Sequence, residues 1–405
     1  MVVAGNILVV DGVRAIHKIL FTMVAPECLH LLLGRKDAKV EDLQLPWRTI
    51  TYLNEEEVNA EWCEYARHLH NRYPLAAVVS FHDNYQERAL DIASSLNLPF
   101  FLSREVILQT RSKRLMRDKL RQAGIEQPAF AMLNSSEDLE TFFARHHQSG
   151  IVIKPEIGSA SEHVLPIQNY SDLLPIKTLC GERGLYPALG EQFIEGQEYS
   201  VEAFSSNGCH HFLGLVKKEK FPNSTIEMGH IFPAPLSSEL QAAIVQYVGA
   251  SLDALGLENG PSHTEIILDS RNFPHIVETH TRPGGDQIWR LLLEVTGINL
   301  MAICAEFALT GALNTLAGAA TNEQRAPAAA IRFAHGTPGK IFTGFRKHAE
   351  SLCNEFTIEV KNLLEEGQSI PALQSSFDRI GYVMGRGNTP EQSWMKCSEI
   401  LAGLL

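Results

Sequence analysis

The sequence lacks the features that mark several common classes of protein. Its seven cysteines are scattered, odd in number and never spaced as CxxC, which argues against a zinc site and against a disulfide framework. Large clusters of Lys and Arg are absent and the formal net charge is −12, so broad binding to nucleic acid is disfavoured. Small-molecule substrates are therefore the better expectation.

Long uninterrupted hydrophobic runs are also missing. The most apolar stretch, 298–320, is broken by polar residues such as Asn299 and Glu306, which are costly in hydrocarbon, so we interpret it as a core helix. The opening run 1–10 has no basic region and leads directly into Asp11, which favours a buried first strand over a signal peptide. These features predict a cytoplasmic protein with no membrane partner.

The composition that remains is typical of a globular chain. Of the 405 residues, 45% are hydrophobic and 20% are charged, and a chain of this length is expected to form two or three packed domains. Short apolar runs at 6–10 and 76–80 alternate with helix-length segments such as 84–96, which predicts a Rossmann-like unit with a parallel sheet. This unit lacks the GxGxxG fingerprint, which argues against a dinucleotide site.

The pattern changes after residue 111. A helix is predicted over 113–122, with Ser112 as its N-cap. A second helix at 136–146 and a strand at 150–154 follow. From 189 to 278, alternating apolar residues predict a mostly antiparallel sheet, interrupted by a helix at 237–255.

The segment 152–164 (VIKPEIGSASEHV) is the first that carries chemistry. A strand that delivers Lys154 beside a loop containing Gly158, Ser159 and Ser161 can place an ammonium group and several backbone N–H groups around a polyphosphate. Gly and Ser also mark turns in general, so an exposed hairpin with a solvated lysine is the alternative.

A second candidate segment is 191–202 (EQFIEGQEYSVE). Its extended backbone beside the apolar Phe193 and Ile194 can pair with an adenine edge, and a carboxylate a few residues on can accept hydrogen bonds from ribose hydroxyls. Strand alternation places Glu198 and Glu202 on one face. The alternative is an edge strand whose acidic residues face solvent.

The strongest pattern lies in 263–266 and 276–286. Two strands joined by a turn would bring Glu265 and Glu278 together, and paired inward carboxylates need a cation. Hard oxygen ligands favour Mg²⁺, which also bridges nucleotide phosphates, and Arg282 can hold a transferring phosphoryl group or a carboxylate. Two unrelated surface glutamates fit poorly with the Arg-Pro-Gly-Gly turn that follows Glu278.

Taken together, the order and spacing of these three segments resemble the ATP-grasp superfamily over roughly 112–309. The resemblance implies a fold of mixed α/β and α+β class, in which ATP lies between two sheets. The implied domains are a Rossmann-like N-terminal domain at 1–111, a small lid subdomain at 112–188, a large catalytic subdomain at 189–325 and a small C-terminal α/β lobe at 326–405.

The resemblance also implies roles for individual residues. Lys113 and Lys154 would bind phosphates, and Glu198 would bind ribose. The full set of predicted ATP-binding residues is Lys113, Lys154, Gly158, Ser159, Ser161, Glu191, Gln192, Phe193, Ile194 and Glu198, with the backbones of Gln192 and Ile194 on adenine. Glu265 and Glu278 would ligate Mg²⁺, with Mn²⁺ as an alternative ion.

Position 280 departs from the superfamily pattern. His280 stands where the superfamily usually has Asn, and imidazole is a poorer Mg²⁺ ligand than a side-chain oxygen. We therefore expect His280 either to ligate the metal or to support the metal site or the substrate. Ala160 and His163 stand where glycines are common, and they are expected to stiffen the phosphate loop.

The run Glu-Thr-His-Thr-Arg-Pro-Gly-Gly-Asp at 278–286 is similar to the L-amino acid ligases, which make dipeptides and related amide antibiotics. That resemblance implies an ATP-dependent ligase that activates a carboxylate as an acyl phosphate and passes it to an amine, with Arg282 and Lys154 as catalytic residues. Glu227 would hold a substrate ammonium and His230 would lie beside a carboxylate. A structural role for His230 is equally compatible with the sequence, and a homodimer is implied by the resemblance alone.

Other interpretations stay open. The run Lys217, Lys218 and Lys220 is most simply a solvated hairpin, although one lysine could face the substrate. A carboxylating or purine-pathway ligase of the same superfamily is one alternative function. An ATP-binding regulatory protein without turnover is another, and a nicotinamide-dependent oxidoreductase is the least favoured.

Overall fold

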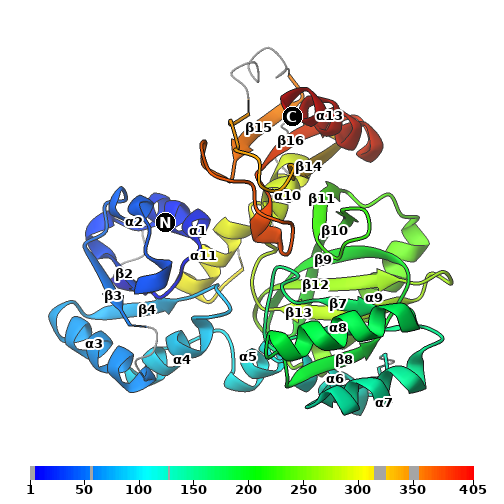
Figure 1. The fold of residues 1–405 in the computed structure, drawn as a ribbon. Helices are drawn as coiled ribbons and strands as arrows, with labels where there is room; N and C mark the ends of the chain where they lie inside the picture. Colours follow the sequence, from blue (N-terminus) through cyan, green and yellow to red (C-terminus); the bar gives the residue numbers. More distant parts are fainter. Residues whose placement is uncertain (1–4, 55–57, 126–127, 314–324, 346–354) are drawn as a thin grey trace.

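The computed structural model describes residues 5–54, 58–125, 128–313, 325–345 and 355–405, and Figure 1 shows their arrangement around three sheets. The N-terminal sheet is parallel, with strand order β3-β2-β1-β4. Its elements are β1 Asn6–Val9, α1 Arg14–Met23, β2 Leu29–Gly34, α2 Val40–Leu43, β3 Thr49–Leu53, α3 Asn59–Arg72, β4 Leu75–Val79 and α4 Gln86–Ser95. The predicted parallel α/β unit is confirmed.

A second, smaller sheet is antiparallel in the order β5-β8-β6-β7. Its elements, with the helices that precede or cover it, are α5 Arg104–Arg111, α6 Lys113–Gln122, β5 Phe130–Leu133, α7 Ser136–His146, β6 Ile151–Lys154, β7 Leu165–Ile167, α8 Tyr170–Glu182 and β8 Ala188–Gln192. Helix α6 begins where the sequence predicts, because the Ser112 hydroxyl accepts a hydrogen bond from the backbone N–H of Leu115.

The third sheet is antiparallel, with strand order β13-β12-β9-β10-β11-β14-β16-β15. Its elements are β9 Gln197–Ser206, β10 Cys209–Lys220, β11 Glu227–Phe232, α9 Ser238–Ala254, β12 Gly260–Leu268, β13 Pro274–His280, α10 Ile288–Thr296, α11 Leu300–Thr310, β14 Ala328–Ala334, β15 Thr357–Asn362, β16 Gly381–Gly387 and α13 Pro390–Leu404. The antiparallel pattern expected over 189–278, with one helix inside it, is confirmed.

The sheets cross two of the predicted domain boundaries. Strand β8 starts at Ala188 but completes the small sheet, and the C-terminal strands β14, β16 and β15 extend the third sheet while packing a core of their own against α13. The strands therefore connect the regions more closely than a division by sequence suggests. The four domain ranges themselves stay predictions.

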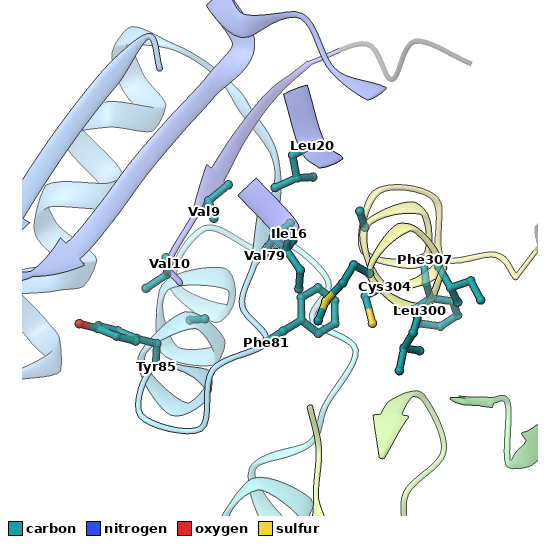
Figure 2. Close-up of a cluster of buried hydrophobic side chains, with 14 of the residues drawn as sticks. Val9, Val10, Ile16, Leu20, Val79, Phe81, Tyr85, Leu300, Cys304 and Phe307 are labelled. Carbon is teal, nitrogen blue, oxygen red and sulfur yellow. The ribbon is translucent and has the colours of Figure 1, made fainter. Parts of the chain in front are cut away.

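Helix α11 joins the N-terminal sheet to the third sheet. Leu300, Cys304 and Phe307 of this helix belong to one buried cluster with Ile16 and Val79 of the N-terminal domain (Figure 2). The helix forms part of the run interpreted as a core helix, and residues 314–320 of that run lie outside the described residues. In the described chain no single helix is long and apolar enough to cross a membrane; α10 and α11 together pass that test, but they are bent by 100°.

The first prediction tests this junction. Leu300→Ala should lower the free energy of unfolding by about 3 kcal/mol, because the fully buried leucine leaves a cavity between the helix and the N-terminal sheet. The measurement is urea unfolding followed by tryptophan fluorescence. Leu174→Ala, at a side chain that is 69% exposed, is the matched control and should change stability by less than about 0.5 kcal/mol. Equal effects of the two substitutions would contradict this account of the junction.

Candidate functional site

A cavity of about 1050 Å³ lies between the second and third sheets. All of the predicted site residues line it except His230: Lys113, Lys154, Gly158, Ser159, Ser161, Glu191, Gln192, Phe193, Ile194, Glu198, Glu227, Glu265, Glu278, His280 and Arg282. The turn 223–227 and the C-terminal residues 373–375 complete the wall. Segments that are far apart in the sequence therefore meet around one space.

Two carboxylates predicted to lie together do so. Glu265 of β12 is directly opposite Glu278 of β13 in the antiparallel register. Carboxylate oxygens of Glu198, Glu227 and Glu265 lie within 4.8 Å of one another. Such a set of hard oxygen donors fits a divalent cation such as Mg²⁺.

An ammonium group lies among these carboxylates. The Lys218 Nζ atom is 2.6 Å from Glu265, 2.9 Å from Glu198 and 3.1 Å from Glu227. Burial alone would lower the pKa of Lys218, but the three carboxylates outweigh it and raise that pKa well above its usual value. Lys218 thus supplies, in this structure, the positive charge that these three carboxylates require.

The simplest interpretation of the lysine run was wrong for Lys218. Its residue exposure is only 2%, because β10 continues through the run and turns this side chain toward Glu198 and Glu265. Alternation along a long strand beside another acidic strand was the available signal. The alternation was hard to recognise because the neighbouring Lys217, on the other face of the strand, is more exposed than Lys218 and makes the whole run look solvated.

The second carboxylate predicted to ligate a metal has a cationic partner on each side. Glu278 lies 2.9 Å from the Lys113 ammonium and 3.1 Å from Nε2 of His280. Burial raises the pKa of Glu278, but Lys113 and His280 more than offset this and hold the pKa well below its usual value. The carboxylate is therefore charged and able to accept a metal ion.

Both ring nitrogens of His280 face carboxylates. Nδ1 is 3.1 Å from Asp83, and Nε2 is 3.1 Å from Glu278. Burial lowers the pKa of His280, as does the neighbouring Arg282, yet the two carboxylates raise it overall. A ring that donates from both nitrogens has no lone pair for a metal, so this geometry favours a supporting role for His280 over direct ligation.

On the opposite wall, a buried ion cluster holds the predicted phosphate lysine. The Glu191 carboxylate lies 2.6 Å from Lys154 Nζ and 2.8 Å from Arg117 Nε. Arg117 also donates to the backbone carbonyls of Ile276 and Val277, so it ties β8 of the small sheet to β13 of the third sheet. Glu191 is predicted to be one of the ATP-binding residues, and in this structure its carboxylate binds these two cations. Sequence reasoning missed Arg117, which is only one of several charges on α6.

The loop 158–163, predicted to bind phosphate, contains residues in a conformation that usually belongs to glycine. Ala160, Ser161 and His163 have φ angles of 59°, 56° and 56°. Such left-handed geometry costs a non-glycine residue about 1 kcal/mol or more. The loop lies against the far wall, because Ser161 donates to the Thr225 carbonyl and the Ala160 carbonyl accepts from the Ser376 backbone N–H. The strained loop therefore closes one side of the cavity.

At the other end of the cavity, the structure separates Glu227 from His230. Glu227 borders the cavity, where it accepts a hydrogen bond from the Ser376 hydroxyl at 2.8 Å. His230 is only 1% exposed and does not line the cavity, and its Nε2 atom lies 3.2 Å from Asp286. Arg379 binds both oxygens of Asp286, at 2.7 and 2.8 Å. The structural role considered for His230 fits this geometry better than contact with substrate.

A buried pair supports the loop after Arg282. His263 Nδ1 is 2.6 Å from Glu202, and Glu202 accepts a hydrogen bond from the Gly284 backbone N–H. Burial lowers the pKa of His263, but Glu202 outweighs it and raises the pKa to about 9. A Cβ at position 284 would lie 2.9 Å from both side chains, so only glycine fits there.

Comparison with known proteins agrees with this geometry. Residues 147–289 match the family model of the ATP-grasp domain. A solved L-amino acid ligase from Bacillus licheniformis superposes with a TM-score of 0.81 at 21% identity, covering 98% of this chain and 97% of that chain. Residues 147–289 are thus similar to the ATP-grasp domain, and the described chain shares the fold of this solved ligase.

Curated relatives match over a shorter stretch. Uncharacterized protein y4rH of Sinorhizobium fredii is 27% identical over 231 residues, which is 55% of this chain and 46% of the relative. Dapdiamide A synthase of Enterobacter agglomerans is 23% identical over 225 residues, 53% of this chain and 52% of the relative. The chain thus spans about half the length of these relatives.

Glu191→Gln should lower the free energy of unfolding by about 3 kcal/mol at pH 7, because it leaves Arg117 and Lys154 without their shared anion. Arg117 and Lys154 lower the pKa of Glu191 to about 2 in spite of burial, so the stabilisation is present above about pH 4.5 and is lost as the pH falls through about 2. Urea unfolding should show the same difference from wild type at pH 7 and pH 5 and a smaller difference at pH 3. Glu140→Gln, at the exposed pair with Lys177, should change stability by less than about 1 kcal/mol at each pH.

Lys218→Met should destabilise the protein by about 3 kcal/mol, because three buried carboxylates lose their common cation. Added Mg²⁺ or Mn²⁺ should raise the melting temperature of this variant more than that of wild type. Lys217→Met on the opposite face of β10 is the control. If the ions raise the melting temperatures of both variants equally, Lys218 does not occupy a cation site formed by Glu198, Glu227 and Glu265.

Proposed function

We propose that this chain is an ATP-dependent ligase that joins the carboxylate of an amino acid or a related acid to an amine, forming a dipeptide or an amide and releasing ADP and phosphate. The observation that carries the proposal is the pairing of Glu265 with Glu278 in one cavity that the ammonium groups of Lys113 and Lys154 also line. Carboxylates for a metal and cations for phosphates are what phosphoryl transfer requires.

The nucleotide would lie along the wall formed by the small sheet. Lys113 and Lys154 would hold phosphate oxygens, and the closed loop 158–163 would contribute backbone N–H groups. The adenine would lie beside the backbones of Gln192 and Ile194, with Glu198 placed to accept hydrogen bonds from the ribose. Phe193 would add an apolar contact.

Glu265 and Glu278 fit Mg²⁺ by donor type and by their direct opposition in the sheet. When bound there, the ion would neutralise phosphate charge. His280 would hold Glu278 in place from behind. The remaining chemistry depends on the protein's own groups.

Arg282 is placed to stabilise charge at the reacting centre. Its guanidinium would hold the transferring phosphoryl group as the substrate carboxylate attacks, and then the oxyanion that forms when the amine attacks the resulting acyl phosphate. The loop 158–163 would keep out water, which would otherwise hydrolyse the acyl phosphate. Glu227 is the residue proposed to receive the substrate ammonium.

The substrate class is supported by the charged residues that line the cavity and by similarity to a dapdiamide A synthase and an L-amino acid ligase. A purine-pathway or carboxylating ligase is the second candidate, and dependence of turnover on a nucleotide intermediate or on bicarbonate would distinguish it. A regulatory ATP binder is the third, and the retained Glu265, Glu278 and Arg282 argue against it.

The test is phosphate release by purified protein with Mg²⁺ and ATP against pairs of amino acids, with product masses measured in parallel. We expect ADP, phosphate and a product equal in mass to the two substrates less one water. Glu278→Ala should lower turnover at least 10²-fold, because it removes a proposed metal ligand. ATP binding without turnover for any pair would instead favour other substrates or a regulatory role.

A further inference from the structure

Asp83 brings a carboxylate of the N-terminal domain to the edge of the cavity. It follows β4, and its Oδ2 atom accepts a hydrogen bond from Arg282 Nε at 2.8 Å and lies 3.1 Å from His280 Nδ1. Asp83 is not among the residues that line the cavity. Asp83 therefore acts on the site through His280 and Arg282, which both line the cavity.

A second pair of hydrogen bonds joins the N-terminal domain to the same strand end. Gln86, at the start of α4, donates from Nε2 to the Thr281 carbonyl at 2.8 Å, and the Thr281 hydroxyl donates back to Gln86 Oε1 at 2.9 Å. Both side chains are almost fully buried. Asp83 and Gln86 thus hold three consecutive residues, 280–282, from the opposite domain.

These contacts fix the guanidinium of Arg282. Its Nε binds Asp83, and its Nη1 donates to the Pro283 carbonyl at 3.1 Å. Among the described residues Nη2 has no hydrogen-bond partner, and Arg282 lines the cavity. A long flexible side chain is thereby restricted to one orientation while one nitrogen stays available to a ligand.

We propose that Asp83 is a positioning residue that orients Arg282 for the reaction and does not itself touch substrate. The inference rests on the proposed function of Arg282. Arg282 and His280 hold the pKa of Asp83 far below its usual value in spite of burial, so the carboxylate is charged when it binds the guanidinium. Misplacing a reacting group by about 1 Å can cost on the order of 10²-fold in rate.

The test is a double-mutant cycle between Asp83 and Arg282. Asp83→Ala should lower kcat by about 10²-fold and leave KM for ATP within about twofold, and Arg282→Ala should lower kcat by about 10³-fold. Because Asp83 acts through Arg282, the double variant should be no slower than Arg282→Ala alone. Losses that multiply, or an Asp83→Ala variant with wild-type kcat, would overturn the proposal.

Two further measurements separate loss of positioning from loss of folding and remain informative if the protein shows no turnover. Asp83→Asn keeps one acceptor oxygen and should fall between wild type and Asp83→Ala, while Asp91→Asn, at a surface pair in the same domain, should match wild type. The Nε–H resonance of Arg282, assigned by its loss in Arg282→Lys, should shift in Asp83→Ala. If wild type shows no turnover, the proposed function fails, and this resonance decides the positioning alone: no shift refutes it.

Discussion

Carboxylates buried between two sheets must each be matched by a cation, because an unpaired buried charge costs several kcal/mol. The site contains Glu191, Glu198, Glu265 and Glu278, all with little exposed side chain. Ion pairs within and between the elements of the two sheets match these charges. The arrangement of the sheets must therefore satisfy the ion pairing as well as the packing of the apolar cores.

The matching cations come from different parts of the chain. Arg117 reaches from α6 to Glu191 and to the carbonyls of β13, and Lys113 reaches from the same helix to Glu278. In the contact between Asp83 and Arg282 the charges are exchanged, because the N-terminal domain supplies the anion and the third sheet leads into the cation. Each pair joins elements from different parts of the chain. The geometry of the site therefore depends on how the domains pack, and the packing depends on these pairs.

The local parts of this arrangement were predictable from sequence. The cap at Ser112, the strand that ends at Lys154 and the opposition of Glu265 and Glu278 all depend on short-range periodicity and turn signals. Contacts across long sequence separations were not predictable. Asp83 lies 199 residues from Arg282, and no periodicity in one sequence encodes that pairing.

Lys218 shows a different reason for failure. Its neighbours made it look solvated, yet 47 residues separate it from Glu265, and only the strand order that places β10 beside β9, next to β12, brings the charges together. A charge run states how many charges are present but not which face of a strand each one occupies. The missing information was the topology of the sheet.

The charge balance also bears on how the proposed ligands would enter. In this structure Lys113 and Lys154 are bound to Glu278 and Glu191, so incoming phosphates must compete with carboxylates for the same ammonium groups. Drawing Lys113 away from Glu278 would leave a buried anion, and a divalent cation on that anion would remove the penalty. Phosphate and metal would each make the binding of the other more favourable, so the pairing of charges favours their entry as a complex over the entry of either alone.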